Sequence, residues 1–484
     1  MRKSFASMAL VLAAVFGLGI HATRAQSNRT LSLEVQQYVR VSSPIVALTH
    51  VRVIDGTGAE PKENQTIVIS GERIQSVGDA SAANIPAGAQ LLDLTGYTVI
   101  PGLVGMHDHM FYPSTRVPIY NEMAYSFPKL YLAAGVTTIR TTGALEPYTD
   151  LELKTLIDSG KAVGPEMYVT GPYLEGAGAY TPQMHELKDA DDARRTVNYW
   201  AGEGVTSFKA YMHITHAELA AAVDEAHKRG LKITGHLCSI GFTEAAEIGI
   251  DDLEHGLFVD TEFVPGKAPD TCPSQADTRK VMADLDLTSA PVQAMIQSLV
   301  AHHVAITSTL PVFEPSVPGR PPLDRRVLDA MLPEAQADYL ANRVRTSTNP
   351  VLIGTGAAVF KKELDFERMF MKAGGTLLAG EDPTGGGGIL AGFGDQREAE
   401  LLVEAGFTPL EALRIYSYNG AQFLGQAERL GTIAAGKVAD LVVIHGDPSK
   451  NIGDIEKVDV VFKDGIGYDS QKLIDAVRGS VGLH

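Results

Sequence analysis

Residues 99–111 read VIPGLVGMHDHMF, an apolar run that ends in two histidines, His107 and His109. Side chains two positions apart on a β-strand point to the same face, so both imidazoles should share one face and Asp108 the other. Two imidazoles at the end of a buried strand can bind a metal ion. This stretch therefore predicts a core strand that ends in part of a metal site.

Seven further apolar segments follow this one, and amphipathic, helix-like segments lie between them. Apolar strands that alternate with helices favour parallel pairing, because the helices then cover the sheet. Eight such units predict an α/β protein of the (β/α)8, or TIM barrel, class. The strand segments are residues 102–109, 136–143, 166–173, 207–212, 231–237, 251–259, 305–311 and 375–382.

Two long insertions interrupt this alternation. Residues 260–290 follow the sixth strand segment, and residues 312–345 follow the seventh. Catalytic loops of such barrels lie at the carboxyl ends of the strands. We therefore expect both insertions to shape the mouth of the barrel.

Short β-rich segments lie at both ends of the chain. Residues 45–58, IVALTHVRVIDGTG, and residues 457–465, KVDVVFKDG, combine apolar runs with turn residues. We expect one small β-sandwich domain built from both chain ends. The expected divisions are a signal peptide at residues 1–25, β-sandwich segments at residues 26–100 and 427–484, and the barrel at residues 101–426.

The first 25 residues have the pattern of a secretory signal peptide. Arg2 and Lys3 precede an apolar core, and small residues precede an expected cut after Ala25. Such a signal predicts a secreted or periplasmic protein, with an uncleaved N-terminal anchor as the alternative. No later segment is long and apolar enough to span a bilayer, so we expect no stable membrane insertion after signal removal.

The 484-residue chain has a formal net charge of −17, and the expected leader contains basic residues but no acid. The mature chain is thus still more acidic, which argues against binding to nucleic acid or to anionic lipid. Hydrophobic content of 45% and charged content of 20% are typical of a globular protein.

The chain has two cysteines, Cys238 and Cys272, which are too few for a disulfide framework. An exported protein allows the two to pair. We expect two unpaired thiols instead.

Polar residues follow four of the later strand segments where each apolar run stops. Because the carboxyl ends of barrel strands meet at one rim, these side chains should converge with the two histidines of the first strand. Imidazole and carboxylate groups together are suitable metal ligands. The four are Lys209, His236, His255 and Asp382. The alternative is that each is an ordinary core or rim residue. Because six such residues occur in strand order, this alternative is less favoured than a metal site.

Lys209 is the unusual member of this set, because an ammonium group is repelled by a divalent cation. Burial can remove its proton. Alternatively, its amine can react with carbon dioxide and form a carbamate, an anion that can bridge two metals. Either change removes the electrostatic conflict.

In chain order the strand ends read PGLVGMHDH, FKAY, TGH, EHG and AGED. This series resembles the amidohydrolase superfamily, and GVTTIR, GFTPLEALRIYSYNGAQFLG and GTIAAGKVADLVV extend the resemblance over nearly the whole mature chain. The resemblance is closest to the branch with two metals and a carboxylated lysine, which includes prolidase-like dipeptidases and ochratoxin-hydrolysing amidases. The imidazolonepropionase-like branch has a similar overall sequence pattern.

The resemblance implies two divalent metal ions, for which zinc is the expected metal. The two histidines of the first strand, with Asp382, would bind the more buried ion. His236 and His255 would bind the second, and Lys209, as a carbamate formed from carbon dioxide, would bridge them. A metal-bridging hydroxide would attack the substrate carbonyl, and Asp382 would transfer the proton to the leaving amine.

Three departures from the family pattern accompany this likeness. The second strand ends in RTTG where many relatives have Arg-Asp. This difference affects a residue that would support the metal ligands, not a ligand itself. Glu381 precedes Asp382 where relatives often have threonine, and we expect Glu381 to point away from the barrel interior. No glutamate lies three residues after His236, which argues against a mononuclear deaminase.

Two further residues are candidate substrate contacts. Tyr211 follows Lys209 at the strand period and can hydrogen-bond a substrate oxygen, with core packing as the alternative. His185 follows the third strand segment and either lines the mouth or is a surface histidine.

These observations predict a metal-dependent hydrolase of C–N amide bonds that acts on a small molecule, either a dipeptide or an N-acyl amino acid. The alternatives are hydrolysis of a cyclic amide, a lactone or a phosphotriester, and a metal-binding protein without turnover. We expect no nucleic-acid partner, and the sequence leaves open whether copies of the chain form a homo-oligomer.

Overall fold

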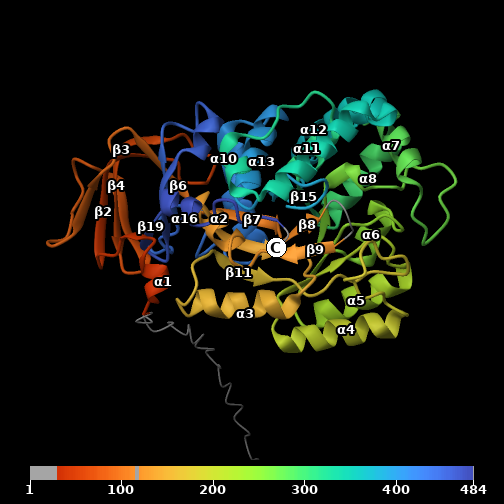
Figure 1. Cartoon of the computed structure of the whole chain (residues 1–484), viewed down its shortest axis with the longest axis horizontal. Coiled ribbons are helices and arrows are strands. Elements are labelled where there is room, and N and C mark those ends of the chain that lie inside the picture. The colour runs from red at the N-terminus through yellow and green to blue at the C-terminus, as the bar shows by residue number, and fades with distance from the viewer. Residues whose placement is uncertain (1–29, 115–118, 483–484) are drawn as a thin grey trace, which may run out of the picture.

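Eight parallel strands alternate with helices in the computed structural model of the chain, which describes residues 30–114 and 119–482 (Figure 1). Each predicted strand segment contains one of them, which confirms the α/β barrel class. The strands are β7 (Leu103–Asp108), β10 (Val136–Thr141), β11 (Glu166–Val169), β12 (Ser207–Ala210), β13 (Lys232–Gly235), β14 (Asp252–Glu254), β15 (Ala305–Ser308) and β16 (Leu377–Ala379).

These strands form two parallel sheets, in the orders β7–β10–β11 and β12–β13–β14–β15–β16. Backbone hydrogen bonds join the sheets at both seams: Gly171 N donates to Ser207 O at 2.9 Å, and Asp382 N donates to His107 O at 3.0 Å. A Cβ atom at Gly380 would collide with the backbone of His107, so glycine permits the close approach at the second seam. The eight strands therefore follow one another around a barrel in chain order.

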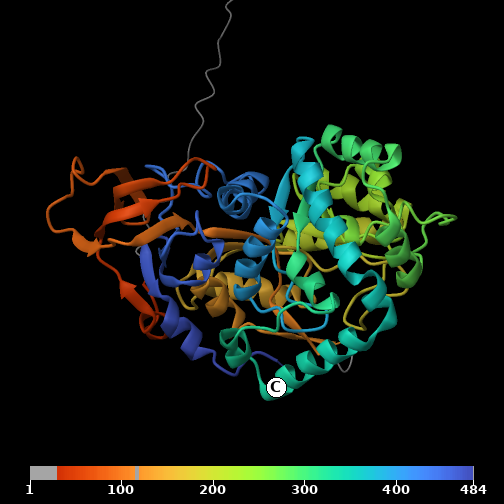
Figure 2. The same ribbon diagram turned by 90° about the horizontal axis from the view of Figure 1, so that it is seen from above.

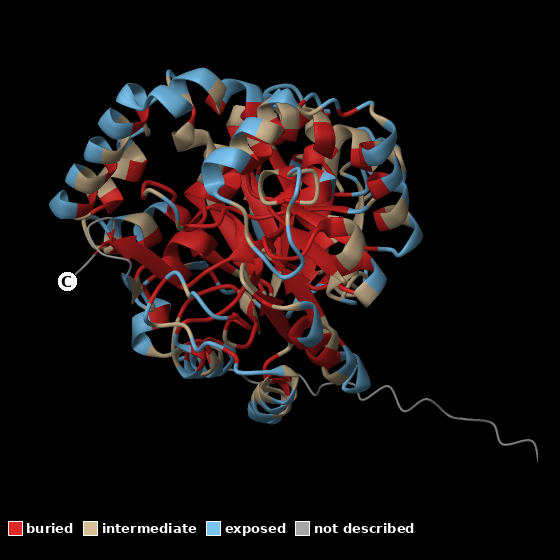
Figure 3. Ribbon diagram, turned by 90° about the vertical axis from the view of Figure 1, so that its right-hand side faces the viewer, coloured by how far each residue is buried: buried red, intermediate tan, exposed pale blue. Residues whose placement is uncertain are grey.

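Helices surround the strands, with exposed outer faces and buried inner faces (Figure 3). In chain order, one main helix lies between each strand and the next, and the last follows β16. These helices are α2 (Phe127–Ala133), α3 (Pro147–Asp158), α4 (Ala190–Glu203), α5 (His216–Lys228), α6 (Phe242–Ile248), α8 (Ala290–Ala301), α12 (Pro350–Lys372) and α13 (Phe393–Glu404). In α5, Thr215 and Glu218 form a capping box, and Leu219, Ala222 and Ala226 recur at helical spacing on its buried face.

The predicted insertions, together with a few flanking residues, contain additional helices. These are α7 (Gln275–Asp284), α9 (Leu310–Phe313), α10 (Arg325–Ala330) and α11 (Pro333–Thr348). A hairpin of β8 (Phe111–Ser114) and β9 (Ile119–Glu122) follows β7, and α14 (Pro409–Arg414) and α15 (Gly420–Phe423) follow α13.

Strands from the two chain ends form one nine-stranded sheet beside the barrel, orange-red and blue in Figure 2. Its order is β1–β19–β18–β17–β6–β2–β3–β4, with β5 beside β2. On β17, Leu441 and Val443 face a core inside this sheet, whereas Val442 and Ile444 face the barrel. The sequence predicts this separate β domain, which is one continuous sheet around its own core. The exact domain limits stay predictions.

The elements of this domain have the following bounds: α1 (Leu33–Gln36), β1 (Val39–Val41), β2 (Ile45–Val53), β3 (Lys62–Ser70), β4 (Arg73–Asp79), β5 (Gln90–Asp93), β6 (Tyr97–Pro101), β17 (Leu441–His445), β18 (Val458–Lys463), β19 (Ile466–Asp469) and α16 (Ser470–Ala476).

The expected signal peptide, residues 1–25, lies outside the described residues. Across residues 30–114 and 119–482, none of the helices combines the length and the apolar character that a membrane crossing requires.

Three buried glutamates support the ends of two barrel strands from behind. Glu363 accepts a hydrogen bond from Phe258 N at 2.8 Å, and Glu398 accepts one from Leu310 N at 2.8 Å. Glu367 accepts one from the Ser308 hydroxyl at 2.5 Å. Burial raises the pKa of Glu367 to about 8, so this side chain is mostly protonated at neutral pH.

We expect Glu367→Gln to stabilise the metal-free protein at alkaline pH. The pKa of Glu367 is about 4.3 in the unfolded chain and about 8 in the folded chain. Between these two pH values the unfolded chain loses the proton more readily, so the free energy of unfolding of wild type falls relative to that of the neutral glutamine variant. Urea unfolding at several pH values measures this difference. Asp365→Asn, an exposed change on the same helix, is the matched control. A difference between Glu367→Gln and wild type that does not change with pH would contradict the expectation.

Candidate metal centre

The carboxyl ends of five barrel strands bring the six predicted ligand residues to one cluster. Two lie in β7 and β12, and four lie within three residues after a strand. The six are His107, His109, Lys209, His236, His255 and Asp382. Their convergence is a feature of the structure, and their individual roles as ligands stay predictions.

The four imidazole rings form a contiguous series. The ring centroids of His109 and His107 lie 5.3 Å apart, those of His107 and His255 4.5 Å, and those of His255 and His236 4.5 Å. Lys209 Nζ lies 3.1 Å from His107 Nε2. Side chains from four strands thus meet around one small volume.

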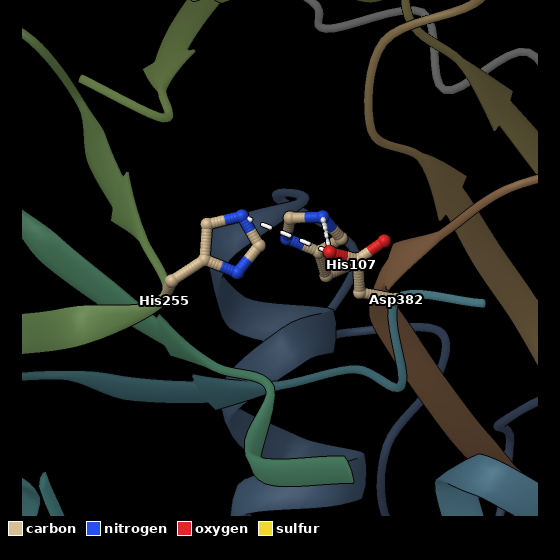
Figure 4. Close-up of side chains that lie close together, drawn as sticks. All are labelled: His107, His255 and Asp382. Atoms are coloured by element: carbon tan, nitrogen blue, oxygen red, sulfur yellow. Dashed lines mark ion pairs between the residues drawn. The ribbon is translucent and has the colours of Figure 1, made fainter. Parts of the chain in front are cut away.

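Asp382 completes this group from the side of β16. Its Oδ2 atom lies 3.6 Å from His107 Nε2 and 3.8 Å from His255 Nε2. Dashed lines mark these two pairs in Figure 4. Its Oδ1 atom lies 3.6 Å from His109 Nε2. His107, His255 and Asp382 each have one potential ligand atom within 4.8 Å of those of the other two. This spacing suits a shared metal ion.

The outer nitrogens of three imidazoles have protein partners. His107 Nδ1 lies 2.7 Å from Glu254, His109 Nδ1 lies 3.1 Å from Gly143 O, and His255 Nδ1 lies 2.7 Å from the Thr309 hydroxyl. Such contacts orient an imidazole so that Nε2 is free for a metal. His255 Nε2 is buried and has no hydrogen-bond partner among the described residues. The donor set therefore fits a metal centre.

Lys209 is 1% exposed and lies among the imidazoles. Burial is the main cause that lowers its pKa, to about 8, and the carboxylates of Glu254 and Asp382 partly oppose this shift. A lysine with this pKa is partly neutral near pH 7.5, and only a neutral amine can react with carbon dioxide.

The chain matches the sequence model of the Amidohydrolase family over residues 98–275 and 379–466, just over half of its length. The chain belongs to this family. Both matched parts together contain all six clustered residues.

Dihydroorotase from Geotalea daltonii is 30% identical to this amidohydrolase over 193 residues, which are 36% of this chain and 43% of that protein. The chain thus matches about two fifths of the length of that curated relative. Among solved structures, a candidate prolidase from Bifidobacterium longum is similar over 90% of this chain and 98% of that chain, with 25% identity and a TM-score of 0.66. A Xaa-Pro dipeptidase with bound methionine is 21% identical, with a TM-score of 0.66 over 88% of this chain and 100% of that chain.

A buried ion-pair network supports the cluster from inside the barrel, and our sequence analysis did not identify it. Arg140 of β10 donates to Glu254 and to Asp252 of β14 at 3.0 Å each, and Glu254 contacts His107. Arg140 also donates to the Met106 carbonyl at 2.9 Å. The available signal was an arginine within an apolar strand and a glutamate directly before His255.

We expect Glu254→Gln in this amidohydrolase to weaken zinc binding by about 10- to 100-fold, because the contact that orients His107 is weakened. Competition with a chromophoric chelator measures the affinity. Glu166→Gln, which alters an ion pair with Arg429 at the other end of β11, is the matched control. Equal zinc affinity in Glu254→Gln and wild type would show that Glu254 does not support the ligands.

The backbone at two of the clustered residues has an unusual conformation. His255 has φ 69° and Asp382 has φ 50°, in the left-handed region that non-glycine residues rarely adopt. Such strain is common at functional sites, where the surrounding structure maintains it. Both residues directly follow or closely follow short barrel strands, so the left-handed turn directs the side chain into the barrel mouth.

Glu381 lies on the opposite side of the backbone from Asp382, as expected from the sequence. It approaches Asp108 and Asp395, and burial together with these two acids raises the pKa of Glu381 well above its usual range. This shift favours the neutral form of Glu381, and Asp382 is the carboxyl group that faces the imidazoles.

All of the clustered residues except His107 line a cavity of about 540 Å³. Both predicted insertions contribute to its wall, through Met282 of α7 and Phe313 of α9, which agrees with their expected place at the mouth. Tyr211 also lines the cavity, with its ring centroid 4.8 Å from that of His236. A cavity of this size accommodates a small substrate rather than a protein chain.

His185 lies outside the cavity that contains the cluster. Its side chain is 57% exposed and lies 3.4 Å from Asp192 on α4. The structure therefore does not bring this predicted substrate contact to the metal centre, and His185 matches the alternative of a surface histidine.

The expectation of two unpaired thiols is wrong, because Cys238 and Cys272 form a disulfide. Cys238 lies two residues after His236, and Cys272 lies in the insertion just before α7. The two cysteines are 34 residues apart in the sequence, so the sequence gives no sign that the loop after β13 and this insertion meet over the cavity. The bond attaches the insertion to the loop that carries His236.

Proposed function

We propose that the chain hydrolyses a C–N amide bond in a dipeptide or an N-acyl amino acid. The observation that supports this proposal is the convergence of four imidazoles, one lysine and one carboxylate beside a small cavity. This donor set suits the chemistry of an amidohydrolase, because bound metal ions would polarise a carbonyl group and a nearby carboxylate would transfer a proton.

The six clustered residues would hold two divalent metal ions, with zinc as the expected metal. When bound, these ions supply an activated water molecule and polarise the scissile carbonyl group. Lys209 would serve as a carbamate: its neutral amine forms a bond to the carbon of carbon dioxide and loses one proton. The resulting anion removes the repulsion that an ammonium group would cause at this position.

Asp382 is the proposed proton carrier. The Thr384 hydroxyl donates to Asp382 Oδ1 at 2.7 Å, which fixes the carboxylate against the cluster. Burial raises the pKa of Asp382 to about 6, and the charge of Lys209 opposes this rise. A carboxyl group with a pKa close to the working pH can accept a proton from water and give it to the leaving amine.

Tyr211 is the proposed contact to a substrate oxygen. Burial raises the pKa of its hydroxyl well above the usual range, so Tyr211 stays a hydrogen-bond donor at all relevant pH values. Its place beside His236 puts a donor next to the metal ligands.

A substrate panel tests the proposal with the zinc-loaded full chain. The panel contains dipeptides and N-acyl amino acids, together with a cyclic amide, a lactone and a phosphotriester. Hydrolysis of linear amides is expected. Turnover of the cyclic amide, the lactone or the phosphotriester alone would favour that alternative, and no turnover with two zinc ions bound would indicate a metal-binding protein without activity.

We further propose that the chain is exported and cut after Ala25. The Cys238–Cys272 disulfide supports this location, because such bonds form outside the reducing cytosol. Intact mass measurement of the protein from the periplasm or medium is expected to show the loss of residues 1–25. A full-length mass in the membrane fraction would favour the uncleaved anchor.

A further inference from the structure

Arg279 lines the same cavity as the ligand cluster and has no partner among the described residues. It lies on α7, in the insertion after the sixth barrel strand. Its Nη1 atom is buried and makes no hydrogen bond, and no described carboxylate forms an ion pair with the guanidinium. Burial lowers the pKa of Arg279, and no neighbouring acid opposes the shift. A cation is thus held at the cavity wall without an anion.

Several other partly buried arginines among the described residues have carboxylate partners. Arg320 donates to Glu404 through two bonds of 2.7 Å, and Arg429 donates to Glu166 at 2.6 Å. Burying a charged group without a partner costs free energy, and a bound anion recovers that cost. A planar guanidinium matches the two oxygens of a carboxylate especially well.

Two features fix α7 over the cavity. The Cys238–Cys272 disulfide attaches the segment before α7 to the loop after His236. The helix packs against α12, beside it in Figure 1. It also packs against residues 256–258, which directly follow His255. Arg279 is therefore held relative to the ligand cluster by a covalent bond and by packing.

An aromatic wall links the cluster to this helix. The ring of Phe313 lies 5.6 Å from that of His255, and it stacks on Phe258 at 3.9 Å. Among the described residues that line the cavity, Arg279 is the sole charged side chain outside the ligand cluster. The cavity thus offers a reactive end, an apolar wall and one cationic group.

We propose that Arg279 binds a carboxylate group of the substrate. The chain would then select amides whose leaving amine is an amino acid with a free carboxylate and an apolar side chain that packs against Phe258 and Phe313. This inference rests on the proposed amide hydrolysis and specifies its substrate class. Neutral amides of the same shape would leave the partly buried guanidinium without an anion.

Matched substrates and variants test this assignment. N-acetyl-L-phenylalanine and its carboxamide differ only in the charged group, and both are offered to the zinc-loaded full chain. We expect wild type to prefer the carboxylate form by about 10- to 100-fold in kcat/KM, mainly through KM, as for a charge-assisted hydrogen bond. Arg279→Gln should lose this preference, mainly through a higher KM for the carboxylate form. Arg279→Lys should retain part of the preference.

Lys280→Gln is the matched control, because it removes the same charge from the next, exposed position of α7. It should keep the wild-type preference. A preference that survives in Arg279→Gln, or that is absent in wild type, would overturn the assignment.

A binding measurement separates this inference from the proposed function. Calorimetric titration of N-acetyl-L-phenylalanine into the full chain needs no turnover. If wild type binds it and Arg279→Gln does not, the carboxylate site stands even when neither compound is hydrolysed. Equal binding by both proteins, or binding by neither, would overturn the carboxylate site even when linear amides are hydrolysed.

Discussion

Lys209→Ala is expected to bind at most one zinc ion per chain and to have no detectable amidase activity. Lys209 Nζ lies 3.1 Å from His107 Nε2 and is buried among the imidazoles, so alanine removes the one side chain that would bridge both ions. Elemental analysis and a linear-amide assay measure the two effects. Short carboxylic acids such as acetate should restore part of the activity, because they can occupy the vacated volume and supply two oxygens.

Lys232→Ala is the matched control for this variant. Lys232 is on β13, at the end of the barrel opposite to the ligands, and its ammonium group lies 4.4 Å from the ring centroid of Phe423. It should retain metal and activity. Two zinc ions bound to Lys209→Ala, or about one ion in saturated wild type, would contradict the bridged pair.

Asp382→Asn should lower kcat by about 10³- to 10⁴-fold, which is the upper range for loss of a proton-transferring group. The amide of asparagine keeps the shape and the bond to Thr384 but accepts no proton near neutral pH. Steady-state kinetics with linear amides measure the loss, and zinc analysis of the same sample shows how much of it follows from weaker metal binding.

Glu381→Gln gives this experiment a control at the adjacent residue. Burial and the nearby Asp108 and Asp395 raise the pKa of Glu381 well above its usual range, which favours the neutral form that glutamine resembles. We expect near-wild-type activity. If Glu381→Gln loses activity and Asp382→Asn keeps it, the two neighbouring carboxyl groups have been assigned in the wrong order.

The strand ends were predictable from the sequence because a parallel barrel places all its carboxyl ends at one rim. An apolar run that stops at a histidine, a lysine or an aspartate is visible without knowledge of any contact. The inward orientation of His107 and the outward orientation of Glu381 follow from the same alternation.

Contacts between elements that are distant in the chain were not predictable in this way. Arg140 pairs with Glu254 because β10 and β14 face each other across the barrel interior, and a one-dimensional pattern does not specify that distance. The pairing of Cys238 with Cys272 and the place of Arg279 depend on the path of an insertion. That path is determined by packing against α12 rather than by local preference.

The nine-stranded sheet has a consequence for how the chain acquires its fold. β6 precedes the whole barrel and β17 follows it, yet the two are hydrogen-bonded neighbours. During synthesis, the edge of β6 stays open until the last tenth of the polypeptide emerges, and such late, long-range pairing is slow. An open strand edge invites association between nascent chains. A chain truncated before β17 would thus keep β6 as an unpaired strand edge. Such truncated chains should precipitate even when the barrel itself is folded.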